Sequence, residues 1–323
     1  MHQEVLVVAE TLKGQWSEVT FELLGAGRTL ARDLGGPLSV VAIGNGITAL
    51  ARSLGAADLV LCAEDPALAD FNPEAYLRVL EAVVSQRTPR IILVANTSMG
   101  MDLAAPLAAR TRLPLVAYCR HVWAEDGRVV ARSQIYGGKI MAEVALEERG
   151  ILSVLAGSFP AEAGRVDGEP DVQAFPVPPL EGVRTKFTRL VEPDASDVDI
   201  TRQEILVAVG RGIGDKENLH LAEDLADALG GVVCASRPLI DNGWLPKTRQ
   251  VGKSGLTVKP KLYLAAGISG APEHIEGMKD SELIIAINSD PRAPIFDVAH
   301  YGVVGDLFDL LPAIAEAIRG RKG

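Results

Sequence analysis

The sequence predicts an α/β protein of two doubly wound domains, each with a mostly parallel sheet flanked by helices. Short, uniformly apolar runs alternate with amphipathic segments of helical spacing, the pattern of parallel strands buried on both faces. The alternation occurs twice, on either side of a proline-rich interruption. In the second half, several apolar runs end in glycine or polar residues, where sheets of this kind bind ligands.

Composition supports a globular chain of this size. The 323 residues are 48% hydrophobic and 23% charged, enough for two separate cores. The net charge of −10 disfavours nucleic acid and anionic membrane surfaces. No apolar run reaches the roughly 18 residues of a membrane helix, and the N-terminus lacks the pattern of a signal peptide. We therefore expect a cytoplasmic protein without membrane insertion.

Cysteines and histidines form no metal-binding pattern. Cys62, Cys119 and Cys234 lie far apart, include no C-x-x-C and are odd in number. The five histidines are scattered, without an H-x-x-x-H. Neither a metal site nor a disulfide framework is expected.

The first domain is expected over residues 1–160. Apolar runs predict strands at Val5–Ala9, Leu38–Ile43, Leu59–Cys62, Arg90–Ala95, Leu115–Cys119 and Ile151–Ala156. Helical spacing predicts helices at Ser17–Leu34, Pro73–Gln86 and Asp102–Arg112. Gly137-Gly138 separates two further strand-like runs, Val129–Tyr136 and Ile140–Leu146, which are therefore read as an antiparallel pair.

A connector is expected over residues 161–200. Prolines interrupt it repeatedly, and each one fixes φ and removes a backbone donor. Thr185–Val191 alternates in the manner of a strand, and the segment 193–199 is acidic and rich in turn residues. A domain boundary belongs in this interval.

The second domain is expected over residues 201–323. Its predicted strands are Glu204–Val209, Val232–Ala235, Lys261–Ala266, Leu283–Ile287 and Tyr301–Val304. Glu217–Leu229 and Leu307–Arg319 are its predicted helices, and Asp306 is a suitable N-cap for the latter.

Two glycine-rich motifs suggest phosphate binding but do not fit familiar nucleotide fingerprints. VAVGRGIGDKENL, residues 207–219, is spaced G-x-G-x-G, with Asp215 in the place of the third fingerprint glycine. The next strand leads to Arg237 rather than to the acid that would bind a ribose diol, which weakens a nicotinamide reading. The motif GKSG, residues 252–255, lacks the upstream glycine and following helix of a Walker loop.

A third motif, LYLAAGISGAPEHIEGM at residues 262–278, has the form of a strand-to-helix anion site. Gly267, Ser269 and Gly270 offer N–H groups and a hydroxyl, Pro272 suits the first helical turn, and His274 falls in that turn. Polar groups also follow the strands at residues 283–287 and 301–304. So many polar strand ends in one domain indicate a nucleotide cofactor.

These motifs resemble the α subunit of electron transfer flavoproteins. The similarity is carried by VGRG (209–212), ASR (235–237), QVGKSG (250–255), LYLAAGISGAPEH (262–274), IAINSDPRAPIF (285–296) and YGVVGDLFDLLP (301–312), in the family's order and spacing. Residues 1–160, with TSMGMDLAAPLAARTRLPLV, resemble the family's N-terminal domain.

The resemblance implies an electron carrier without a substrate of its own. It implies an FAD-binding C-terminal domain of deoxyhypusine-synthase-like fold, and a nucleotide-alpha-hydrolase-like N-terminal domain that holds no cofactor. Its partner would be a β subunit carrying AMP or a second FAD. Electrons would pass from flavin dehydrogenases, such as the acyl-CoA dehydrogenases of fatty acid β-oxidation, to a quinone reductase or another acceptor.

The resemblance also implies the FAD site. Arg237 would lie beside the isoalloxazine, Ser254 would offer its hydroxyl to flavin N5, and His274 would lie near the pyrimidine end. The implied positions, which include the ADP-binding end at Asn288, Asp306 and Leu307, are Arg211, Ser236, Arg237, Val251, Gly252, Lys253, Ser254, Gly267, Ser269, Gly270, Ala271, Pro272, Glu273, His274, Asn288, Asp306 and Leu307.

Two departures from the family pattern bear on the redox potential and the partner. Lys253-Ser254 stands where Gln-Thr is usual, and Pro272-Glu273 stands where Ile-Gln is usual. Other readings are a bifurcating flavoprotein that uses NADH, a nicotinamide-dependent enzyme on a similar fold and a non-catalytic adaptor. The polar strand ends would have no purpose in an adaptor.

Overall fold

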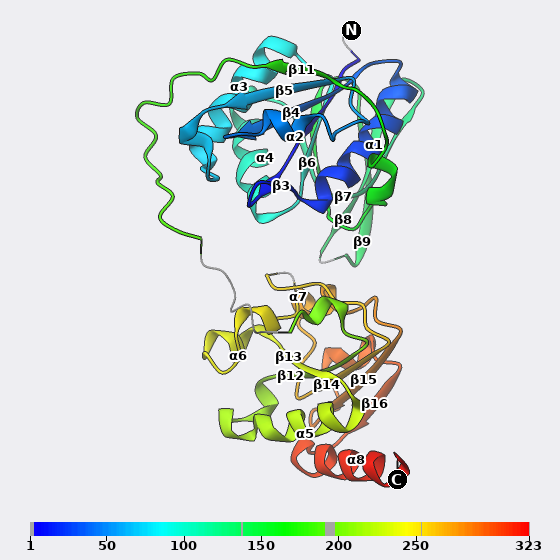
Figure 1. Cartoon of the computed structure of the whole chain (residues 1–323). Helices are drawn as coiled ribbons and strands as arrows, with labels where there is room; N and C mark the ends of the chain where they lie inside the picture. The colour runs from blue at the N-terminus through cyan, green and yellow to red at the C-terminus, as the bar shows by residue number, and fades with distance from the viewer. Residues whose placement is uncertain (1–2, 137, 191–197, 253, 323) are drawn as a thin grey trace. The chain divides into compact units, whose positions relative to one another are not determined.

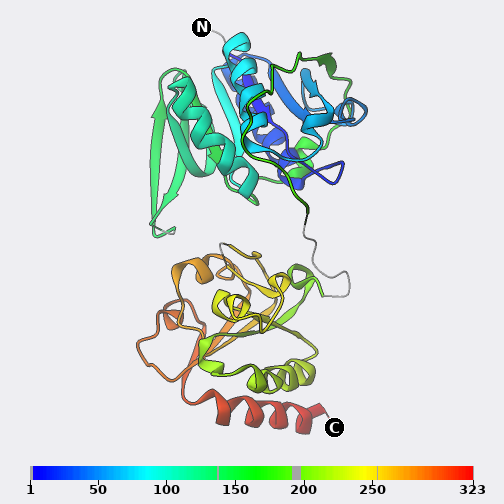
Figure 2. The same cartoon turned by 90° about the vertical axis from the view of Figure 1, so that its left-hand side faces the viewer.

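The chain divides into two compact units, one ending at Arg189 and one beginning at Leu190. The computed structural model describes residues 3–136, 138–190, 198–252 and 254–322. Each unit is an α/β layered structure with its own sheet, as drawn in Figures 1 and 2, so the predicted fold class is confirmed.

A nine-stranded sheet organises the first unit. Its strands run in the order β11-β5-β4-β1-β6-β10-β7-β8-β9. They are β1 Val5–Val8, β4 Leu38–Gly44, β5 Leu59–Glu64, β6 Ile91–Ala95, β7 Leu115–Glu125, β8 Arg128–Ile135, β9 Ile140–Leu146, β10 Gly150–Val154 and β11 Asp171–Ala174. A separate two-stranded ribbon joins β2 Thr11–Leu12 to β3 Gln15–Trp16.

Helices cover both faces of this sheet. They are α1 Glu18–Leu34, α2 Thr48–Ala51, α3 Pro73–Arg87 and α4 Ser98–Thr111. Alternate residues of β1 enter different cores: Val5 and Val7 pack with α1, whereas Leu6 and Val8 pack with α3 and α4. The all-apolar strands of the sequence follow from this two-sided burial.

Two features of the first unit differ from the sequence-based expectation. Asp171–Ala174, inside the predicted connector, is strand β11 and pairs in parallel with β5. The predicted strand Thr185–Val191 is wrong over its described part, because residues 185–190 form no strand; Val191 lies outside the described residues. Thr185 is instead held by the N-terminus of α3, where its N–H donates to the Glu74 carboxylate at 3.0 Å.

The second unit has a five-stranded, wholly parallel sheet. Its order is β13-β12-β14-β15-β16, and its strands are β12 Ile205–Val209, β13 Val232–Ala235, β14 Leu262–Ala266, β15 Leu283–Asn288 and β16 Tyr301–Val304. The chain moves from β12 to one neighbour, β13, and then returns to the other, β14. This reversal is the point at which doubly wound sheets bind ligands.

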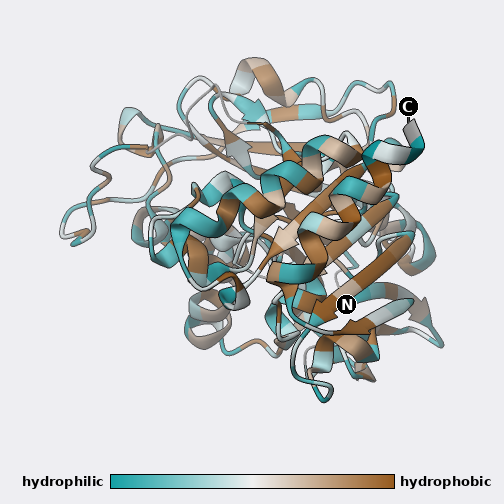
Figure 3. Cartoon of the chain, turned by 90° about the horizontal axis from the view of Figure 1, so that it is seen from below, coloured by the Kyte–Doolittle hydropathy of each residue, from teal (hydrophilic) through white to brown (hydrophobic). Residues whose placement is uncertain are grey.

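Among the described residues of the second unit, two α-helices are long and two are short. Helices α5 Leu219–Leu229 and α8 Leu307–Lys322 share one core with the sheet. Helices α6 Arg237–Asp241 and α7 Pro272–Glu276 are short and follow β13 and β14. Figure 3 shows hydrophilic residues along the outer sides of the helices and hydrophobic residues on the strands. The predicted N-cap is confirmed, since Phe308 N–H donates to Asp306 Oδ1 at 2.9 Å.

Candidate functional site

A pocket of about 830 Å³ opens at the carboxyl ends of the second sheet. Its volume lies in the range of cofactor sites. It brings together residues that the sequence placed at one site: Arg211, Ser236, Arg237, Val251, Gly252, Ser254, Gly267, Ser269, Ala271, Glu273, His274, Asn288, Asp306 and Leu307. Gly270 and Pro272 do not line it, and Lys253 lies outside the described residues.

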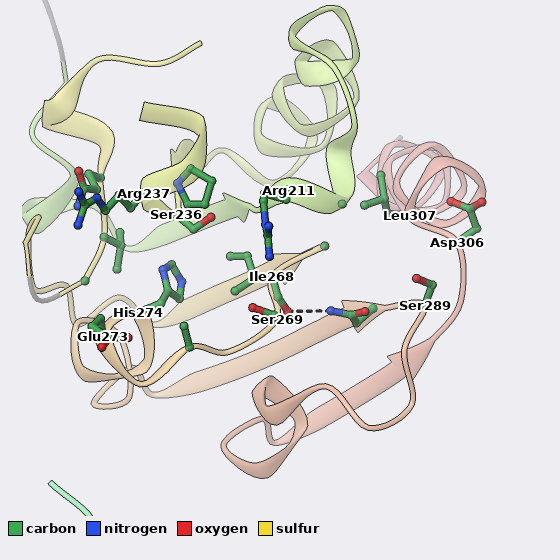
Figure 4. A pocket seen from close by; sticks show the side chains of 18 of the residues that line it. Arg211, Ser236, Arg237, Ile268, Ser269, Glu273, His274, Ser289, Asp306 and Leu307 are labelled. Carbon is green, nitrogen blue, oxygen red and sulfur yellow. Dashed lines mark hydrogen bonds between the residues drawn. The ribbon is translucent and has the colours of Figure 1, made fainter. Parts of the chain in front are cut away.

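Much of the pocket lining lies where strands end, and a second part comes from residues 250–252 and 254. Arg211 follows β12, Ser236 follows β13, and Ile268 and Ser269 follow β14. The amide of Asn288 lies at the end of β15, and the carboxylate of Asp306 lies after the end of β16. Figure 4 shows these side chains converging from separate strands, with Arg211 in the middle of the pocket. The parallel topology therefore brings together strand-end residues that are far apart in sequence.

Glycines allow the ends of β12 and β14 to touch. Gly212 N–H donates to the Gly267 carbonyl at 3.1 Å. Gly267 has φ +64°, and a Cβ there would stand 2.8 Å from Gly212 Cα. The two turns can therefore lie against each other because neither glycine carries a Cβ, and both glycines line the pocket.

Position 270 requires glycine for a different structural reason. Its φ is +86°, and a Cβ would come within 2.2 Å of the Ile295 nitrogen. Ile295 N–H in turn donates to the Ser269 carbonyl at 3.1 Å. Gly270 thus lets the loop after β14 lie against another loop, behind the pocket wall.

Two polar side chains brace the pocket loops. Asn288 donates from Nδ2 to the Ile268 carbonyl at 2.8 Å, the dashed line in Figure 4. Gln250 donates from Nε2 to Ser254 Oγ at 2.9 Å. Because the Ser254 hydroxyl accepts that bond, its own proton is available for an acceptor in the pocket.

His274 is the buried polar group of the pocket wall. Only 6% of its surface is exposed, and Nε2 lies 2.9 Å from the Tyr263 hydroxyl. Nδ1 is buried and has no hydrogen-bond partner among the described residues. Burial lowers the pKa of His274 to about 4, against a smaller opposing effect of the Val251 backbone. The imidazole is therefore neutral near pH 7.

Positive charge in the pocket comes from arginines instead. Arg211 lines the pocket. Arg237 is largely exposed, and its Nε donates to the Asp241 carboxylate on the next turn of α6 at 3.1 Å. Because this ion pair is exposed, it holds the guanidinium weakly, and a bound anion can compete for it.

Sequence reasoning missed several lining residues. Gly212, Gln250, Ser289 and Gly305 follow or adjoin strands that were recognised, so the strand-end rule itself would have found most of them. Pro238, Ile268 and Phe308 carried no signal of ligand binding. The full set of missed residues is Gly212, Pro238, Gln250, Ile268, Ser289, Gly305 and Phe308.

Comparison with known proteins matches both units to one family. The family described as "Electron transfer flavoprotein domain" matches residues 5–180, more than half of the chain. The family described as "Electron transfer flavoprotein FAD-binding domain" matches residues 199–279, which include much of the pocket.

Full-length relatives agree. The electron transfer flavoprotein subunit alpha of Bacillus subtilis is 36% identical, over 99% of this chain and 98% of its own. The chain belongs to the electron transfer flavoprotein alpha subunit family. Protein FixB of Clostridium saccharobutylicum is 39% identical over 97% of this chain and 95% of its own. The Acetobacterium woodii "Lactate dehydrogenase (NAD(+),ferredoxin) subunit LctC" is 37% identical, over 99% of this chain and 78% of its own.

The pocket fits the FAD of this family. In this chain the pocket combines a volume of about 830 Å³ with glycine turns and with Arg211 and Arg237, whose guanidinium groups suit phosphates. The buried Nδ1 of His274 lacks a partner that a flavin can supply. Within the described ranges, no cluster of three or more potential metal ligands occurs. In the same ranges, no helix combines the length and apolarity needed to cross a membrane.

Proposed function

We propose that this chain is the FAD-holding subunit of a heterodimer that carries electrons between other proteins and transforms no substrate itself. Its partner is a β subunit, which binds AMP or a second FAD. The observation that carries the proposal is the pocket of the FAD-binding domain, which combines Arg211, glycine turns and a buried imidazole nitrogen that has no hydrogen-bond partner among the described residues. The N-terminal domain, by this proposal, holds no cofactor.

Bound FAD supplies one- and two-electron redox chemistry. The residues of this chain tune it by position and charge. Arg211 and Arg237 favour negative charge on the cofactor, and the glycine turns after β12 and β14 carry no Cβ, so a pyrophosphate can approach their backbone closely. Ser254 and His274 contribute neutral hydrogen bonds. Glu273, also in the lining, adds opposing negative charge.

The donor is a flavin dehydrogenase, with acyl-CoA dehydrogenases of fatty acid β-oxidation as the first class to test. The acceptor is a quinone reductase or another carrier. The experiment is to purify the chain with its β subunit, count flavin and AMP per heterodimer, and follow flavin reduction by an acyl-CoA dehydrogenase and its substrate. A colourless heterodimer that takes up no added FAD would refute the proposal.

A bifurcating carrier is the second candidate. It is favoured by the name of one relative, the subunit LctC of a lactate dehydrogenase whose name includes both NAD(+) and ferredoxin. In that case the β subunit holds a second FAD. Two flavins per heterodimer, together with reduction by NADH alone, support this candidate; one flavin and one AMP support the simple carrier.

A further inference from the structure

Tyr263 lies directly beneath the histidine of the pocket wall. It belongs to β14 and is fully buried. Its hydroxyl lies 2.9 Å from Nε2 of His274, which belongs to α7. The strand and the helix that follows it are thus joined by a buried side-chain hydrogen bond immediately behind the pocket.

The second neighbour of the hydroxyl decides the direction of that hydrogen bond. The buried thiol of Cys234, on β13, lies against the same oxygen. Burial raises the pKa of Cys234 to about 12 and raises the pKa of Tyr263 well above its ordinary value, so both keep their protons. An imidazole nitrogen is a good acceptor, whereas a thiol sulfur is a weak one. The arrangement that uses each group best has the thiol donating to Tyr263 and Tyr263 donating to His274.

The position of the imidazole proton follows. A neutral imidazole carries one N–H, and a nitrogen that accepts a hydrogen bond cannot carry it. With Nε2 accepting from Tyr263, the proton is on Nδ1. This N–H is buried at the pocket near the Val251 backbone, with which it forms no well-aligned hydrogen bond, so a ligand acceptor would bind it favourably.

We propose that Tyr263 is a positioning residue: its hydroxyl fixes His274 in the Nδ1–H tautomer and presents that N–H to an acceptor atom of the flavin. The ligand half of the proposal rests on the proposed function. The tautomer half rests only on the buried contacts of the chain. The two halves can therefore be tested separately.

The first test is ¹⁵N NMR of the full-length chain labelled at histidine, with His274 assigned by the His274→Gln variant. The chain is measured without FAD, and then as the FAD-loaded heterodimer. We expect a protonated Nδ1 and an unprotonated, hydrogen-bonded Nε2 in both samples. A protonated Nε2 in the FAD-free chain would overturn the proposal, without reference to any cofactor.

The second test measures the FAD dissociation constant in variants. Tyr263→Phe removes one hydroxyl and should weaken binding about threefold to tenfold, the range of one neutral hydrogen bond. Tyr301→Phe makes the same change at a residue 66% exposed and outside the pocket lining, and should leave the constant unchanged. The NMR spectrum of Tyr263→Phe should show loss of the single tautomer.

A double-mutant cycle separates positioning from packing. His274→Asn keeps an N–H donor near Nδ1 but has nothing at Nε2 for Tyr263 to hold. Adding Tyr263→Phe to His274→Asn should therefore change FAD affinity no further. Equal losses in both backgrounds would mean that Tyr263 acts only by packing and would overturn the proposal. A heterodimer that binds no FAD refutes the proposed function instead, and the FAD-free spectrum still decides the tautomer.

Discussion

His274 is both buried and ionisable, so its protonation state affects the charge of the pocket. Its place in the short helix α7, near the N-terminal end, already disfavours a protonated ring. The structure gives a stronger reason for a neutral ring: burial lowers the pKa to about 4. In the pocket, Arg211 and Arg237 therefore provide the positive charge, whereas His274 provides a hydrogen bond from a neutral ring.

The stability of the second unit should consequently depend on pH through His274. Unfolded histidine binds a proton near pH 6.5, but in the fold it does so only near pH 4. Between these values the unfolded state holds more protons, so the free energy of unfolding falls as pH falls, by about 1.4 kcal/mol per unit. Above pH 6.5 this contribution is fully present. Urea unfolding of the FAD-free chain at pH about 7, 6 and 5 measures the slope.

His274→Gln is the matched control for that slope. Glutamine cannot take up a proton, so the variant should lose less stability than the wild type as pH falls. Identical slopes in the two proteins would show that the ring is already exposed to protons in the folded state.

Site residues could be predicted from the sequence where they stand at the end of a predicted strand. Arg211 and Ser236 each follow a strand, Asn288 ends one, and strand ends of a parallel sheet meet at one edge. Tyr263 could not be assigned in this way, because it looks like any buried aromatic residue of a strand. Only the structure shows that its hydroxyl reaches His274 across one turn of the chain.

At the scale of elements, the contact between the ends of β12 and β14 depends on the absence of side chains. Gly267→Ala would place a Cβ 2.8 Å from Gly212 Cα and 2.8 Å from Leu307 Cδ2, at a positive φ. We expect the second unit to lose roughly 1–3 kcal/mol for the overpacking, beyond the cost of the backbone conformation. FAD affinity should fall as well, since the turn lines the pocket. Urea unfolding and FAD titration measure the two effects.

Gly243→Ala separates backbone conformation from crowding. Gly243 has φ +68°, close to that of Gly267, but no atom lies within 4 Å of a Cβ built there. This variant should show only the cost of the positive φ. If Gly267→Ala were no more destabilising than Gly243→Ala, close contact of the two turns would not be what requires glycine.

One carboxylate of α3, that of Glu74, makes several contacts with the connector. Glu74 accepts from the N–H groups of Arg184 and Thr185 and pairs with the Arg184 guanidinium at 3.0 Å. The N–H of Arg184, foremost among these contacts, lowers the pKa of Glu74 to about 2. Glu74→Gln removes the charge that strengthens these bonds. Trypsin should then cut after Arg184 or Lys186 severalfold faster.

Glu81→Gln is the comparison for this change. Glu81 lies on the same helix but pairs with Arg110, 2.9 Å away on α4, rather than with the connector. Its substitution should leave the cleavage rate unchanged. Equal cleavage of Glu74→Gln and the wild type would mean that other contacts hold the connector, such as that of Arg78 Nη1 with the Glu181 carbonyl at 2.7 Å.

Most strands were predictable as elements because both faces are buried, but β11 was not. Asp171–Ala174 is mostly exposed and pairs on one side only, so it shows no apolar run. Thr185–Val191 shows the opposite error, since the alternation of its sequence is matched by neither sheet pairing nor burial over residues 185–190, which are all exposed. The place of β10 between β6 and β7 also does not follow from its order in the chain.

At the scale of the whole molecule, two sheets with separate cores share one chain. The first unit has cores on both faces of its sheet, and the second unit likewise. The pocket is lined entirely by residues of the second unit. A ligand in the pocket therefore raises the free energy of unfolding of the second unit. It raises that of the first unit only if the two units unfold together.

FAD should accordingly stabilise one thermal transition and not the other. We expect two transitions in the FAD-free chain. At a free FAD concentration 100 times the dissociation constant, the transition of the second unit gains about 2.7 kcal/mol, which raises its midpoint by roughly 10 °C. The transition of the first unit should stay in place. Differential scanning calorimetry at several FAD concentrations measures both, and Gly267→Ala should reduce the shift through its weaker affinity. Equal movement of both transitions would mean that the two units unfold as one cooperative body, because energy bound in the pocket would then stabilise the whole chain.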